Sequence, residues 1–97
     1  MRFMFNKAGH SATAWNSIGI LKIYATNISD LFYDCVRAKA TLNIYSNPTN
    51  YNNAFTYSTT GNDALITVNY SSATTNIDNI IATKDSNSNV VKGVQLD

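Results

Sequence analysis

The sequence predicts an all-β protein, a single small antiparallel sandwich or barrel of about six or seven strands that follows an extended N-terminal arm. The first observation is composition: the 97 residues are 44% hydrophobic and only 13% charged, contain no Glu, and include 14 Asn, 11 Thr and 9 Ser. Plentiful β-branched and aromatic residues with few Glu and Lys favour strands. The second observation is spacing, because short alternating apolar segments are separated by turn-forming residues.

The length suffices for one domain, in which residues 1–17 form the arm and residues 18–97 form the β domain. The arm is irregular, apart from a short strand expected over residues 2–5. Residues 18–25 read IGILKIYA, a segment that is apolar on both faces and therefore predicts a covered strand.

Residues 35–46 predict the next strand, because apolar side chains alternate strictly with polar ones from Val36 to Tyr45. A helical alternative places Leu31, Cys35 and Ala38 on one face, with Ser29 or Asp30 as the cap. The alternation favours the strand, preceded by a turn or a single helical turn at 29–33.

The second half of the chain predicts two hairpins. Residues 54–59 and 64–70 form the first, joined by a Gly-Asn-Asp turn. Ile77, Ile80 and Ile81 have helical spacing, but Ile, Asn and Thr are mediocre helix formers. We therefore predict a strand at 78–84, which pairs with a final strand at 90–96. No internal sequence repeat is convincing.

Catalytic chemistry is not indicated, and we predict that the chain is not an enzyme. The chain has a single histidine, His10, and a single cysteine, Cys35, which are 25 positions apart. The sequence therefore indicates neither a metal-binding cluster nor a nucleophile–base pair. The lone cysteine is expected to be a buried apolar residue. The four glycines form no phosphate-binding pattern. We expect no cofactor and no metal.

Nucleic acid and membranes are not expected as partners. A formal net charge of +1 gives no electrostatic footprint for either. Arg37 and Lys39 share a predicted strand face with Tyr45. Two basic residues and one aromatic residue are too few to form the basic stripe of a nucleic-acid-binding surface. No signal peptide is evident, and no apolar run is long enough to span a membrane.

Aromatic side chains are the best candidates for contact with a partner or a glycan. In the arm, Phe3, Phe5 and Trp15 are expected to dock on a neighbouring subunit. In the middle of the chain, Tyr51, Phe55 and Tyr57 stand among Asn and Thr, residues suited to stacking on sugars and bonding their hydroxyls. The loop at 47–53 is the expected exposed contact.

A short Asn-, Thr-, Ser- and Tyr-rich β chain with little charge resembles small bacteriophage virion accessory proteins of the capsid-decoration, head-fibre or tail-adaptor type. The closing segment, IIATKDSNSNVVKGVQL, is similar to hairpins that end phage fibre modules. The resemblance implies a non-enzymatic structural component, assembled in the host cytoplasm and located in the virion, with itself or other virion proteins as partners. The alternative is a carbohydrate- or receptor-binding β-module that uses exposed Tyr and Asn side chains, and a third is a small phage effector that targets a host protein.

Overall fold

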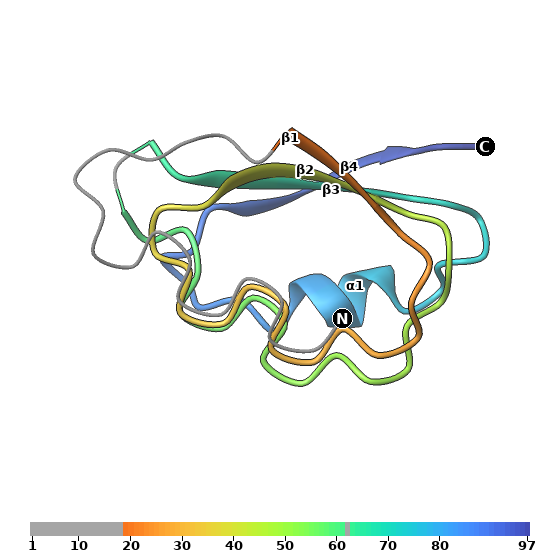
Figure 1. Cartoon of the computed structure of the whole chain (residues 1–97), viewed down its shortest axis with the longest axis horizontal. Coiled ribbons are helices and arrows are strands. Elements are labelled where there is room, and N and C mark those ends of the chain that lie inside the picture. The colour runs from red at the N-terminus through yellow and green to blue at the C-terminus, as the bar shows by residue number, and fades with distance from the viewer. Residues whose placement is uncertain (1–18, 62) are drawn as a thin grey trace.

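The computed structural model describes residues 19–61 and 63–97. Four strands and one short helix follow in the order β1 (Gly19–Ile23), β2 (Lys39–Ile44), β3 (Leu65–Tyr70), α1 (Ile77–Ile81) and β4 (Val90–Gln95). The strands form one sheet, while α1 and the irregular segments lie on the opposite side of the molecule (Figure 1).

The sheet is parallel throughout, and its order β1-β2-β3-β4 follows the order of the chain. In register, Leu21 pairs with Leu42, and Leu42 pairs with Val68. Between β3 and β4 the register shifts after Val68. Each of the first three strands therefore begins a coil that crosses to the other side of the molecule and returns to the sheet at the next strand, which is a β-solenoid-like arrangement.

The core lies between the sheet and the segments opposite it. Along β2, Ala40, Leu42 and Ile44 are buried, whereas the residues between them are exposed or half-buried. The segment that follows β1 supplies Ile28, Leu31, Phe32 and Cys35, and the next coil supplies Ala54 and Phe55. Phe32 stacks on Phe55 with ring centroids 6.0 Å apart, so consecutive coils pack directly on each other.

The three coils share a weak sequence repeat of apolar residues, which is recognised only when the strands are aligned. After each strand, apolar residues recur at positions i, i+3 and i+4 of the opposite segment. The sets are Ile28, Leu31, Phe32, then Tyr51, Ala54, Phe55, and then Ile77, Ile80, Ile81. Solenoids that place one strand and one helical or turn segment in each coil, as leucine-rich repeats do, have a period of roughly 20–29 residues. The likeness is one of architecture.

The first two opposite segments are chains of tight turns joined by a backbone ladder. The amides of Ile28, Asp30, Phe32 and Asp34 donate to the carbonyls of Asn50, Asn52, Ala54 and Thr56 at 2.7–2.9 Å. Left-handed backbone recurs at matching positions, because Asp30 and Asn53 have φ near 58° and so do Asp34 and Tyr57. Asp and Asn tolerate this conformation better than other non-glycine residues do.

The third segment is helical, so its carbonyls are less available to the coil before it. Side-chain oxygens serve instead: Phe55 N donates to Thr83 Oγ1 at 3.1 Å, and Tyr57 N donates to Asp85 Oδ2 at 2.8 Å. At the start of α1, Asn76 N donates to Asn47 Oδ1 at 3.0 Å. These bonds satisfy backbone amides that would otherwise lack partners between the second and third coils.

The predicted antiparallel sandwich or barrel is wrong, since every strand pair of the described sheet is parallel. The predicted strand at 35–46 shrinks to β2, because residues 35–38 belong to the turn that precedes it. Residues 54–59 form turns, so the hairpin with β3 does not exist. The strand predicted at 78–84 is α1 and the turn after it. The final strand exists as β4, yet it pairs in parallel with β3.

The antiparallel prediction failed for a physical reason. Period-2 alternation indicates a strand that is buried on one face, but it does not indicate whether the neighbouring strand is parallel or antiparallel. The covered strand expected at 18–25 is also corrected: in β1 only one face is buried, and Ile20 keeps 68% of its surface exposed. The N-terminal arm at 1–17 lies outside the described residues.

Candidate functional site

The outer face of the sheet is the candidate site. Its side chains come from alternate positions of the strands and stand in rows across the sheet. From the amino ends toward the carboxyl ends of the strands, the rows contain Lys39 and Leu65, then Ile20, Thr41 and Thr67, then Lys22, Asn43 and Asn69, then Tyr24 and Tyr45. Polar, cationic and aromatic groups thus share one surface.

Tyr24 and Tyr45 form an aromatic pair just beyond the carboxyl ends of β1 and β2. Their ring centroids are 5.2 Å apart and their planes differ by 16°, so the rings are stacked. Tyr24 is 67% exposed and Tyr45 37% exposed. Tyr45 is also fixed from its backbone, because its amide donates to the Ile23 carbonyl at 2.9 Å. An exposed, ordered pair of phenol rings offers a ligand both apolar faces and hydroxyl groups.

Beside the tyrosines, two asparagine amides are joined across the sheet. Asn69 Nδ2 donates to Asn43 Oδ1 at 3.0 Å, and Asn69 Oδ1 accepts from the backbone amide of Val94 at 2.9 Å. Gly93 makes room for this arrangement, since a Cβ there would overlap Asn69 Oδ1. The register shift between β3 and β4 lies at the same place. The amides are therefore held in fixed orientations.

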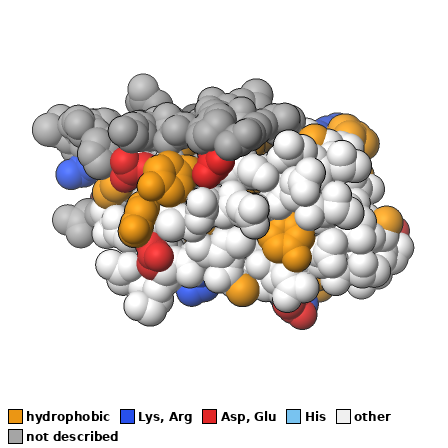
Figure 2. Space-filling model, turned by 90° about the horizontal axis from the view of Figure 1, so that it is seen from below, with side chains coloured by type: hydrophobic (Ala, Val, Ile, Leu, Met, Phe, Trp, Pro, Cys, Tyr) orange, Lys and Arg blue, Asp and Glu red, His pale blue; other side chains and the backbone are white. Residues whose placement is uncertain are grey.

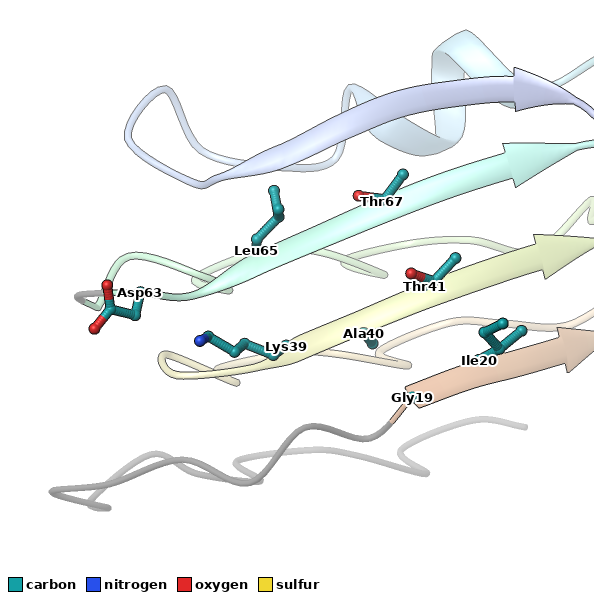
Figure 3. A pocket seen from close by; sticks show the side chains of 8 residues that line it. All are labelled: Gly19, Ile20, Lys39, Ala40, Thr41, Asp63, Leu65 and Thr67. Atoms are coloured by element: carbon teal, nitrogen blue, oxygen red, sulfur yellow. The ribbon is translucent and has the colours of Figure 1, made fainter.

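A hollow of about 410 Å³ lies at the amino end of the same face (Figure 3). Ile20 and Leu65 supply apolar walls, and Thr41 and Thr67 supply hydroxyls between them. Lys39 and Asp63 bring one positive and one negative charge to it. Its mixed lining suits a ligand with both apolar and hydrogen-bonding surfaces.

The opposite side of the molecule bears the turns and α1. Figure 2 views this side and shows scattered hydrophobic and charged side chains among polar ones. Its main aromatic contact is between Tyr33 and Tyr57, which meet edge to face at 5.6 Å.

The predicted contact residues do not form one platform. Phe55 is fully buried and Tyr51 packs against the core, whereas Tyr57 is 53% exposed. The geometry thus corrects the idea of a shared Tyr51–Phe55–Tyr57 surface. Phe3, Phe5 and Trp15 lie outside the described residues, as does His10.

Residues with reactive side chains are not gathered. Within residues 19–61 and 63–97 there is no group of three or more His, Cys, Asp or Glu side chains that could hold a metal. Cys35 is fully buried, as expected for a small apolar residue. In the same part of the chain, no helix has the length and apolar character needed to cross a bilayer.

Sequence reasoning missed the tyrosine pair and the joined amides. Lys39 and Tyr45 were expected on one face and do share it, but Tyr24 was placed in a strand covered on both sides. In the parallel register of β1 and β2, paired residues are 21 positions apart in the sequence. This spacing brings Tyr24 beside Tyr45, and it cannot be deduced from the local sequence pattern.

Comparison with known proteins adds no relative: no protein-family model, curated protein or solved structure matches this chain. The architecture of the described residues is a β-solenoid-like arrangement with one parallel sheet.

Proposed function

We propose that the chain is a non-catalytic binding module that holds a glycan on the outer face of its parallel sheet. The observation that carries the proposal is the exposed Tyr24–Tyr45 stack beside the joined amides of Asn43 and Asn69. Sugars combine apolar ring faces with many hydroxyls, so aromatic faces next to fixed amides and hydroxyls complement them. Solenoids commonly use such extended surfaces for binding.

The test measures glycan binding by the whole chain and by single variants. Tyr24→Ala is expected to weaken binding about tenfold, because it removes the more exposed stacking ring. Tyr57→Ala is the matched control, since Tyr57 is also half exposed but lies among the turns opposite the sheet. A glycan array followed by calorimetry on the best ligand gives both affinities.

Equal loss of affinity in the two variants, or no glycan binding by the parent chain, would contradict the proposal. Thermal unfolding of each variant checks that the fold is intact. Tyr24→Ala is expected to change stability by less than about 1.5 kcal/mol, since it removes one surface aromatic contact.

The role as a structural component of a virus particle stays a prediction, as do self-assembly and the arm's contacts. No finding supports a virion location, and the β-sandwich with which that role was coupled is wrong. The mass of the native assembly tests self-association directly.

A further inference from the structure

The outer face of the sheet carries two lysines and, at its amino end, one carboxylate. Lys22 and Lys39 both point to this side, and neither has a hydrogen-bond or ionic partner among the described residues. Asp63 is the carboxylate at the rim of the hollow, before β3 begins. The other described carboxylates are in the turn segments, in α1 or at the end of the chain: Asp30, Asp34, Asp78, Asp85 and Asp97.

The two lysines are spaced along the direction of the strands. Lys22 pairs in register with Asn43, which is four residues beyond Lys39 on the same strand. Four residues of a parallel strand span about 13 Å. Thr41 lies between them, and the Tyr24–Tyr45 pair follows at the carboxyl end. An extended ligand lying along β1 and β2 therefore meets both cations and the aromatic pair.

The two asparagine side chains on this face each use their amide oxygen to accept a hydrogen bond, which sets the direction of their NH₂ groups. The backbone amide of Val94 can only donate, which fixes Asn69 with its oxygen toward Val94 and its nitrogen toward Asn43. Asn43 must then present its oxygen to Asn69, which directs its NH₂ group to other partners. Together with two ammonium groups, this gives a face that favours acceptor-rich, anionic ligands.

From these observations we infer that the ligand is an acidic polysaccharide, a chain of sugars bearing carboxylate groups. The inference rests on the proposed glycan-binding function and names its substrate class. The ammonium groups of Lys22 and Lys39 pair with carboxylates along the polymer, Asn43 donates to a hydroxyl or carboxylate oxygen, and Tyr24 stacks on a sugar ring. An acidic peptide is less well matched, because strand faces expose side chains and offer none of the backbone groups with which an extended peptide pairs.

The experiment uses the whole chain and two polymers that share one backbone: polygalacturonate, which is anionic, and its fully methyl-esterified form, which is neutral. Binding is measured by calorimetry at low and at physiological salt. Polygalacturonate is expected to bind at least tenfold more tightly at low salt, and the preference is expected to shrink as salt screens exposed charges. Lys22→Gln and Lys39→Gln are each expected to weaken binding about threefold to fivefold, the range of an exposed ion pair.

Lys84→Gln is the matched control, since Lys84 follows α1 on the opposite side of the molecule, and its substitution is expected to leave the affinity unchanged. If both polymers bind equally and without salt dependence, glycan binding stands and the acidic class is overturned. If neither polymer binds and a glycan array is also negative, the proposed function itself fails. If poly-glutamate binds as tightly as polygalacturonate with the same lysine dependence, the ligand is an acidic peptide and the inference is overturned.

Discussion

At the scale of single residues, two buried threonines differ in whether their hydroxyl groups are hydrogen-bonded. Both Thr59 and Thr74 are 2% exposed. Thr74 Oγ1 lies 2.7 Å from the Ser46 carbonyl and also accepts from the Ser71 amide at 3.3 Å. Thr59 Oγ1 has no partner among the described residues, and its backbone is left-handed with φ of 51°. A buried hydroxyl without a partner costs free energy, whereas a bonded one stabilises.

Replacement by valine keeps the shape of threonine and removes only the hydroxyl's bonding. We expect Thr59→Val to raise the free energy of unfolding by about 1 kcal/mol and Thr74→Val to lower it by about 1–3 kcal/mol. Urea unfolding of the two variants beside the parent chain measures both changes. Destabilisation by Thr59→Val would show that this hydroxyl is bonded in solution.

Asp97 contributes a pH-dependent contact at the end of the chain. Ser72 Oγ and Ser72 N each donate to its carboxylate at 2.7 Å, and these bonds lower the pKa of Asp97 below its ordinary value. The contact is therefore complete above the ordinary carboxyl range and is lost as the pH falls through the lowered pKa. We expect Ser72→Ala to raise the pKa of Asp97, measured by NMR titration of the carboxyl carbon. A pKa that does not move would contradict the hydroxyl contact.

At the scale of elements, the repeat of apolar residues determines which side chains stabilise each coil. Phe55 stacks on Phe32 in the core, although sequence reasoning had grouped it with Tyr57 as a contact residue. We expect Phe55→Ala to lower the free energy of unfolding by about 3–5 kcal/mol, because it leaves a cavity between two coils. Tyr57→Ala is expected to cost less than about 1 kcal/mol. Similar losses in denaturant titrations would mean that the coils are not stacked as described.

The elements also show why the hairpins were predicted wrongly. Residues 64–70 were correctly predicted to be a strand, because Ile66 and Val68 are buried on one side. Its partner could not be deduced, since residues 54–59 alternate weakly but belong to turns with left-handed positions at Tyr57 and Thr59. Likewise, Ile77 and Ile80 form a single-sided helix only because the coil beneath them provides a surface to bury against.

At the scale of the whole molecule, a solenoid is stabilised by contacts between neighbouring coils. β2 and β3 each have a strand on both sides, whereas β4 pairs with β3 alone among the described strands. We therefore expect the amides of β2 and β3 to exchange with solvent more slowly than those of β4, which hydrogen exchange followed by NMR measures.

The same measurement at rising protein concentration addresses self-association. Val91 and Val94 are exposed on β4, and an exposed strand edge invites another strand. Protection of β4 that grows with concentration would support the predicted self-assembly. Protection equal to that of β3 at every concentration would contradict the expected order of exchange.

By itself, the sequence determined roughly where the four strands lie, which faces of β2 and β3 are buried, and that Cys35 is buried, because these features depend on local alternation and side-chain chemistry. Only the tertiary structure decided that the strands are parallel, that the residues between them form a second wall, and that Tyr24 lies on Tyr45. Those outcomes depend on the number of residues in each coil, which sets the strand that each strand pairs with. An alternating pattern of apolar residues does not determine that number.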